Sequence, residues 1–182
     1  YRPYLVKINS SGTVQWSITT TNTISTVQNG EDYAGLIKDV IVDSSDNVYI
    51  SISTGTSGGA FTKRLHVLKF NSSGTVQWHK RFNSTGTYLS AISGTTIDMC
   101  ITTGGVLVVC WDDNTEGNPA TTAIVGLDPS DGSISWQRVI NKKNYSSLHA
   151  HPLGGWCFSI AEGSSPYGGY IARLPDDGSL TG

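Results

Sequence analysis

The acidic segment from Asp112 to Gly117 carries residue types that bind calcium. Oxygen ligands recur at alternate positions, Asp112, Asn114 and Glu116, and a glycine follows, as at the start of a calcium-binding loop. Such a loop also needs a bidentate acid at its twelfth position, which is Ala123 in this chain. Because the ligand set is incomplete, we expect a solvated connecting loop and no bound metal, with these three residues as the calcium candidates.

Two histidines, His149 and His151, are spaced so that an extended strand would place them on one face. A pair of imidazoles on one face can begin a zinc site, but such a site needs further ligands. No Cys, Asp or Glu lies near enough in the sequence to complete the set. We therefore expect both histidines to be ordinary strand residues.

The chain has no local signature of nucleophilic catalysis. A serine or cysteine nucleophile needs a histidine base and an orienting acid, and no G-x-S-x-G motif or equivalent is present. The acids cluster in turn-like segments such as Asp128 to Asp131 and Asp176 to Asp177, where turn chemistry explains them. We expect a protein that is not an enzyme and that uses no cofactor.

The three cysteines, Cys100, Cys110 and Cys157, lie in apolar, strand-like runs without metal-ligand spacing. In a hairpin that turns near Gly104 and Gly105, Cys100 and Cys110 would not face each other directly, and disulfide geometry is demanding. We therefore expect buried, reduced thiols.

The composition excludes two broad classes of partner. The chain has 12 Lys and Arg residues against 14 Asp and Glu residues, a formal net charge of −2, and its basic residues are scattered. Nucleic-acid binding needs a dense basic patch, so we expect no nucleic-acid partner. No run of about 18 apolar residues is present, so we expect a soluble protein without membrane insertion.

The dominant feature of the sequence is a long-period repeat. Lys7 to Trp16 returns almost letter for letter as Lys69 to Trp78, and degenerate copies follow at Gly126 to Trp136 and at Arg173 to Leu180. The turn glycines stand at positions 12, 74, 132 and 178, so the intervals are 62, 58 and 46 residues. A propeller blade of four short strands takes roughly 40 to 50 residues, more when its loops are long.

Strand signals dominate each repeat, because β-branched and aromatic residues alternate with polar ones between turn residues. The first hairpins are expected at residues 39–53, 97–111 and 148–160. The second hairpins are expected at residues 4–18, 66–82 and 123–140, and from residue 170 onward. The repeat units are therefore 4–18 (partial), 37–82, 94–140 and 147–182 (truncated).

These units predict an all-β fold: one β-propeller region over residues 1–182, built of four-stranded antiparallel blades, of which about three to four are present. Propellers commonly have about four to eight blades, so this sector could not close a ring. The chain is expected to be an excerpt of a larger protein, completed by further sequence or by partner chains.

Trp16, Trp78 and Trp136 each follow a turn glycine by four residues, after Gly12, Gly74 and Gly132. A wide side chain that recurs once per repeat is expected to pack between neighbouring sheets, where its indole N–H can find a carbonyl. Gly178 marks the corresponding turn of the truncated copy. We assign these residues to the structure of the repeat.

The segment Gly126 to Trp136 resembles the tryptophan-docking motif of quinoprotein-type propellers, in which an Asp-containing turn ends in Gly and a Trp follows four residues later. The two other Trp-bearing copies have Asn in place of Asp and a turn one residue shorter. The resemblance implies a propeller fold and supplies no quinone site. The Asp-box of sialidase propellers does not fit, because its aromatic residue follows the Gly after three residues.

Over essentially its whole length, the chain resembles repeat-bearing structural proteins of tailed bacteriophages, especially marine ones. The resemblance rests on Leu68 to Trp78 and on the ending Gly169 to Gly182. It implies a virion protein, a propeller associated with the tail, nozzle or fibre, that serves assembly or host-surface contact. The expected partners are other virion proteins and further copies of the chain.

Two alternatives remain at this stage. The first is a propeller that binds carbohydrate or another cell-surface ligand through rim aromatics, for which Tyr88, Tyr145 and Tyr167 are the candidates. The second, more remote, is an enzyme domain of the quinoprotein class. A propeller fold alone does not separate these functions, because the fold hosts many.

Overall fold

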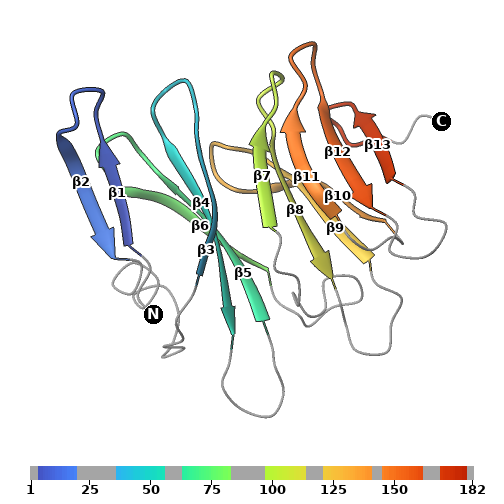
Figure 1. Cartoon of the computed structure of the whole chain (residues 1–182), viewed down its shortest axis with the longest axis horizontal. Coiled ribbons are helices and arrows are strands. Elements are labelled where there is room, and N and C mark those ends of the chain that lie inside the picture. Colours follow the sequence, from blue (N-terminus) through green and yellow to red (C-terminus); the bar gives the residue numbers. More distant parts are fainter. Residues whose placement is uncertain are drawn as a thin grey trace. The chain divides into compact units, whose positions relative to one another are not determined.

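The computed structural model describes residues 4–19, 36–55, 63–82, 97–113, 121–140, 145–161 and 169–179 (Figure 1). These residues form 13 strands in four antiparallel sheets, and no helix occurs among them. The predicted all-β class is confirmed, whereas the described sheets do not themselves define a closed propeller. No helix long and apolar enough to cross a membrane occurs in this described part. The chain divides into two compact units, Tyr1–Phe82 and Asn83–Gly182.

The first unit contains six strands. They are β1 (Tyr4–Ile8), β2 (Val14–Thr19), β3 (Leu36–Val42), β4 (Val48–Gly55), β5 (Lys63–Phe70) and β6 (Val76–Phe82). β1 and β2 form a two-stranded sheet, and the other four form a sheet in the order β3-β4-β5-β6.

The second unit contains seven strands. They are β7 (Ile97–Ile101), β8 (Leu107–Asp113), β9 (Thr121–Leu127), β10 (Ile134–Ile140), β11 (Tyr145–Ala150), β12 (Trp156–Ala161) and β13 (Gly169–Leu174). One sheet has the order β10-β9-β8-β7 and the other has the order β11-β12-β13.

The predicted hairpins are confirmed, because each pair of strands expected from the turn residues is antiparallel and adjacent. The last hairpin is represented by β13 alone among the described residues. The cysteine prediction also holds for the pairing: Cys110 lies opposite Asp98, and Cys100 lies opposite Val108. All three cysteines are free thiols; Cys100 and Cys110 are buried, as expected, but Cys157 is only half-buried.

One five-residue turn recurs between paired strands, and residues 71–75 show its construction. The side-chain oxygen of Asn71 accepts the backbone N–H groups of Ser73 and Thr75, at 3.1 and 2.8 Å. The Gly74 N–H donates to the Asn71 carbonyl at 3.0 Å, and its φ of 81° lies in the left-handed region, which glycine adopts at little cost. Residues 9–13, with the same sequence from Asn9 to Thr13, form the same hydrogen bonds.

Other turns keep this geometry with different residues. The first position, whose side chain accepts a backbone N–H, is occupied by Asp43, Thr102 and His151. The left-handed position is occupied by Asp46, Gly105 and Gly154. A side-chain acceptor followed by a left-handed residue is thus what these turns share.

Each unit has its own apolar core between its two sheets. In the first unit, Leu5 of β1 packs with Ile50, Ile52, Leu68 and Phe70 of the four-stranded sheet. The second core joins the apolar faces of β8 and β9 to those of β11 and β12. The central strand β8 is apolar on both faces, and Leu107 to Trp111 are all fully buried, so its sequence is a continuous apolar run.

The turn glycines predict a graded response to alanine. A Cβ on Gly12, whose φ is 80°, would meet no atom within 4 Å, whereas a Cβ on Gly74 would lie 2.9 Å from Trp16 Cδ2. We expect Gly12→Ala to cost about 1 kcal/mol for the left-handed backbone, and Gly74→Ala to cost about 1–3 kcal/mol more for the clash. Denaturant unfolding of the two variants measures the difference. Equal losses would show that Trp16 does not press on Gly74.

Candidate functional site

The most prominent contact between the two sheets of each unit is made by a tryptophan of one sheet that packs on a turn of the other sheet. Trp16, on β2, donates its indole N–H to the carbonyl of Ser72 at 2.9 Å. The same ring stacks on Phe70 with centroids 6.3 Å apart, and it lies against Gly74. The indole therefore joins the two-stranded sheet to the turn between β5 and β6.

The second unit repeats this contact. Trp136, on β10, donates its indole N–H to the carbonyl of Asp176 at 2.7 Å, and a Cβ on Gly178 would lie 2.7 Å from its ring. Gly126, its cross-strand neighbour, also has to lack a side chain, since a Cβ there would lie 2.3 Å from the indole. The separation along the chain between donor and acceptor is 56 residues for Trp16 and 40 residues for Trp136.

The turn 175–179 of the second unit accepts further hydrogen bonds from side chains. Trp156 stacks on Trp136 at 5.8 Å and donates its indole N–H to the carbonyl of Pro175 at 3.1 Å. Arg138 Nε donates to the carbonyl of Gly178 at 3.0 Å. Three carbonyls of one short turn are thus satisfied by side chains from two other strands, which fixes the turn on the sheet edge.

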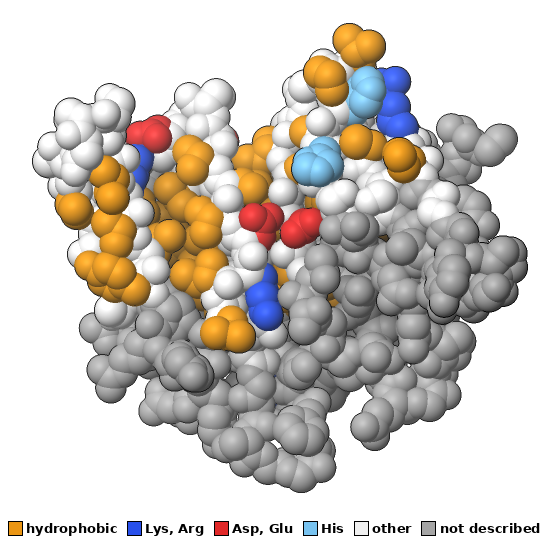
Figure 2. Space-filling model, viewed as in Figure 1, with side chains coloured by type: hydrophobic (Ala, Val, Ile, Leu, Met, Phe, Trp, Pro, Cys, Tyr) orange, Lys and Arg blue, Asp and Glu red, His pale blue; other side chains and the backbone are white. Residues whose placement is uncertain are grey.

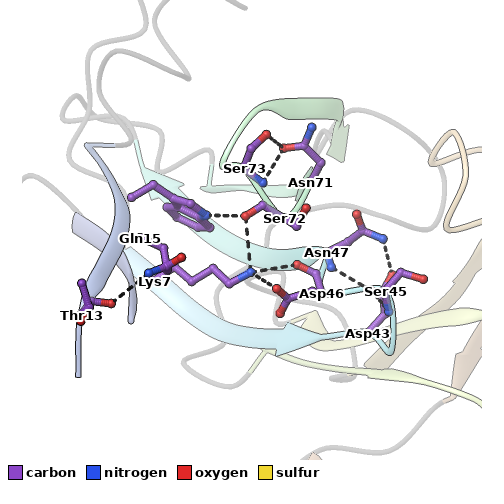
Figure 3. Close-up of polar contacts among 11 residues, drawn as sticks. Lys7, Thr13, Gln15, Asp43, Ser45, Asp46, Asn47, Asn71, Ser72 and Ser73 are labelled. Atoms are coloured by element: carbon purple, nitrogen blue, oxygen red, sulfur yellow. Dashed lines mark hydrogen bonds and ion pairs between the residues drawn. The ribbon is translucent and has the colours of Figure 1, made fainter. Parts of the chain in front are cut away.

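In the first unit, a lysine reinforces the contact between sheets (Figure 3). Lys7, on β1, forms an ion pair with Asp46 and reaches toward the carbonyls of Asp46 and Ser72, both at 3.4 Å. Lys7 thus spans two turns of the neighbouring sheet. Asp46 holds the left-handed position with φ of 66°, where other turns have glycine. Because Asp46 is largely exposed, the ion pair contributes little stability, about 1 kcal/mol or less.

The turn acids are held as carboxylates by their hydrogen bonds. Burial raises the pKa of Asp43, but hydrogen bonds from Asn47, Tyr49 and Ser45 outweigh this effect and the net pKa is lowered. Burial raises the pKa of Tyr49, whose hydroxyl donates to Asp43 at 3.1 Å. Asp43 therefore serves as a structural acceptor at the start of its turn.

A histidine pair lies on the same four-stranded sheet, with His66 buried and His79 half-buried. His66 Nδ1 and His79 Nε2 are 2.9 Å apart, the rings stack with centroids 5.1 Å apart, and Thr54 Oγ1 lies 3.1 Å from His66 Nε2. Burial lowers the pKa of His66 to about 3, and so do the charge that His79 carries when it is protonated and the positive charges of Arg81 and Arg64. Burial, with Arg81, also lowers the pKa of His79. Both imidazoles are neutral near pH 7.

Sequence inspection did not find this pair. His66 and His79 lie on different strands, on either side of the turn 71–75, and no local motif joins them. They come together because the antiparallel register places His79 opposite Leu68, one step along the same face from His66. The alternation of the two strands, once paired through the turn, is the signal that could have found them.

Most of the residues that the sequence offered as metal or ligand candidates lie outside the described part of the chain. Tyr88, Tyr167, Asn114 and Glu116 lie outside the described residues, and so do the side chains of Tyr145, the first residue of β11, and Asp112, on β8. His149 is exposed on β11, while His151 Nδ1 accepts the Leu153 N–H at 3.1 Å within its turn. Within the described ranges, no three His, Cys, Asp or Glu residues lie close enough to hold a metal ion.

An open hollow lies beside the turn 175–179, lined by Gly154, Gly155, Arg173 and Asp176 among others. Arg173 Nη2 donates to the carbonyls of Leu153 and Gly154, at 2.9 and 3.0 Å. Its guanidinium is thereby committed to holding β13 against the neighbouring turn. The hollow therefore presents structural contacts rather than a grouping for acid–base chemistry.

Comparison with known proteins adds no family. A scan against protein-family models finds no match, and a search of the curated proteins finds none either. The geometry of the docked tryptophans and the repeat itself are therefore the basis for the function proposed below.

The docked indoles predict a stepwise loss of stability. We expect Trp16→Phe and Trp136→Phe each to lower the free energy of unfolding by about 1 kcal/mol, because the hydrogen bond to the turn carbonyl is lost. Replacement by alanine should cost about 3–5 kcal/mol, because the ring contacts are lost as well. Denaturant unfolding measures both, with Ser135→Ala on the exposed part of β10 as the control. Unchanged stability of both Phe variants would contradict the indole hydrogen bonds.

The histidine pair predicts a loss of stability in acid. His66 binds a proton with the ordinary pKa of 6.5 when unfolded, but only near pH 3 when folded. Between these values the unfolded chain holds the extra proton, so the free energy of unfolding falls as the pH falls, by up to about 1.4 kcal/mol per pH unit for this group.

Urea unfolding between pH 7 and pH 4 tests this expectation by comparing the wild type with His66→Gln. The wild type should lose more stability over this range than the variant. His149→Gln, which changes an exposed histidine, is the control and should follow the wild type. The same pH dependence in all three proteins would rule out His66 as its source.

Proposed function

We propose that this chain is a sector of a β-propeller that serves as a non-enzymatic structural module of a virion, associated with a tail, nozzle or fibre. The observation that carries the proposal is the repeated contact of an indole with the turn of the next sheet. This contact occurs in both units with the same donor atom, the same turn position and the same close approach to glycine. A repeat that fastens each sheet to the next is suited to a stiff scaffold.

The short turns keep one geometry from repeat to repeat, whereas the connecting segments differ in sequence, and this contrast supports an assembly or contact role. Within each unit the short turns occupy one end of the sheets (Figure 1). The strands leave the opposite end toward connecting segments that differ in length and sequence from one repeat to the next. A scaffold with constant turns and variable connections can present different surfaces without changing its core.

The resemblance of Leu68 to Trp78 and of Gly169 to Gly182 to phage structural repeats gives this scaffold its proposed location in the virion. Its partners would be other virion proteins and further copies of the chain. The enzyme alternative has less support, since the polar clusters described above act as turn acceptors and inter-sheet contacts.

Purified virus particles that encode this chain test the proposal. Quantitative mass spectrometry should find the chain in the particle at a fixed copy number that matches a symmetry of the tail or its fibres. Immunogold labelling should place it on that part. A chain that stays in the soluble fraction of the lysate as a free monomer of 19.4 kDa would contradict the assembly role.

The position of the three candidate tyrosines favours a second function. Tyr88 and Tyr167 belong to the variable connections, and Tyr145 opens β11 directly after one. Aromatic side chains on variable connections suit recognition of a cell-surface glycan.

A glycan array tests this second function. Saturable binding of a defined glycan, reduced by Tyr145→Ala and by Tyr167→Ala but unchanged by Tyr4→Ala on β1, would support it. Tyr4 is exposed and lies on the hairpin that carries the turn 9–13. Absence of binding across the array, or binding that none of the variants changes, would count against it.

A further inference from the structure

The turn of residues 9–13 is built like the turns that accept an indole N–H, but among the described residues no side chain lies on its glycine. Its sequence, Asn-Ser-Ser-Gly-Thr, is that of the turn 71–75, which Trp16 covers. The hydrogen bonds to Asn9 Oδ1 match those to Asn71 Oδ1, at 3.1 Å from the third residue and 2.8 Å from the fifth. A Cβ on Gly12 would meet nothing within 4 Å, whereas one on Gly74 or Gly178 would collide with an indole.

The sheet face next to this turn is exposed where its equivalents are buried. Ile8 stands at the repeat position of Phe70, on which Trp16 stacks, and Ile8 is 56% exposed whereas Phe70 is fully buried. Tyr4 stands at the position of His66, and Tyr4 is 59% exposed against 3% for His66. Val14, opposite Ile8, adds to this apolar face.

These apolar residues lie on one side of the β1–β2 hairpin. Side chains alternate along a strand, and Leu5, Trp16 and Ile18 point into the core of the first unit. Tyr4 and Ile8 therefore point the other way, and so does Val14, which pairs with Ile8 beyond the bulge between Lys7 and Ile8. Figure 2 shows hydrophobic side chains gathered at the left of the view, over β1 and β2.

We propose that the turn 9–13 and the outer face of β1 and β2 form a preformed dock for a Trp-ended hairpin of the same repeat. The incoming indole would stack on Ile8, lie over Gly12 and donate its N–H to the carbonyl of Ser10. Ser10 holds the turn position of Ser72 and Asp176, whose carbonyls accept the indole N–H groups of Trp16 and Trp136. The inference needs only this geometry and does not depend on the virion assignment.

The direction of docking identifies the occupant. Trp16 docks on a turn later in the chain, and so does Trp136. The occupant of the turn 9–13 is therefore a hairpin of a repeat placed before β1 in the polypeptide. The tryptophans of a second folded copy do not qualify, because Trp16 and Trp136 are engaged with their own turns and Trp78 is buried on β6.

An extended chain, in which residues 121–168 are joined directly to residue 3 of the full sequence, tests the dock. Gly169 to Leu174 align with Pro3 to Ile8, so the junction keeps the natural register of the repeat. In this protein β11 and β12 of the added segment precede β1, and the added Trp136 stands 40 residues before Ser10, the separation it has from Asp176.

The expected result is slowed hydrogen exchange at the indole N–H of the added Trp136, by about tenfold or more relative to an unfolded chain, with a higher Tm than the 182-residue protein. Gly12→Ala should weaken both effects, because a side chain there enters the indole's place. Gly105→Ala is the matched control: its φ is also 80° and its Cβ would meet nothing within 4 Å. An added indole that exchanges as in an unfolded chain, or equal effects of the two alanines, would overturn the proposal.

If the added segment fails to fold, a measurement on the unextended protein still tests the dock. N-acetyltryptophanamide is titrated into the 182-residue chain and backbone amide shifts are followed by NMR. Selective, saturable shifts at residues 8–12, absent from Gly12→Ala and present in Gly105→Ala, support the dock. Shifts no larger there than in the turn 102–106 would contradict it.

Discussion

The structure depends on the close approach of an indole ring to the backbone of a five-residue turn. The approach needs a residue with positive φ and no side chain, which Gly74 and Gly178 supply, and a carbonyl that points outward, which Ser72 and Asp176 supply. An indole ring that stacks on an apolar neighbour and also donates its N–H to a carbonyl contributes buried apolar area and a directional hydrogen bond. The sheets of each unit are therefore held at a defined register as well as in contact.

Much of the fold follows from local signals in the sequence. Turn residues such as Asn71 and Gly74 define the hairpins because their side-chain and backbone preferences act within five residues. The same locality explains the cysteine result, since the turn after Ile101 places Cys100 and Cys110 at different levels. Trp16 and Trp136, which the Gly-to-Trp spacing marks, each contact a turn of another sheet, whereas the ring of Trp78 lies 6.0 Å from that of Tyr49 in its own sheet. The sequence alone does not say that Trp16 contacts the turn containing Gly74.

The contacts that sequence inspection missed join residues from different repeats or strands. Lys7 and Asp46 are 39 residues apart, and His66 and His79 face each other only through the register of β5 and β6. Such pairs leave no local pattern, because their geometry is set by strand pairing for His66 and His79 and by the stacking of sheets for Lys7 and Asp46. Candidate ligand residues such as Tyr88 and Asn114 fall in connections whose sequences vary between repeats, where a single sequence carries little structural information.

The central claim, that the indole and the turn glycine form one unit, is tested most directly by a double-mutant cycle on Trp16 and Gly74. Denaturant unfolding gives the cost of Gly74→Ala in the wild type and in Trp16→Ala. If the ring presses on the glycine, the cost should fall in the Trp16→Ala background to about the 1 kcal/mol of a left-handed alanine. Costs that agree within about 0.5 kcal/mol in the two backgrounds would contradict the claim.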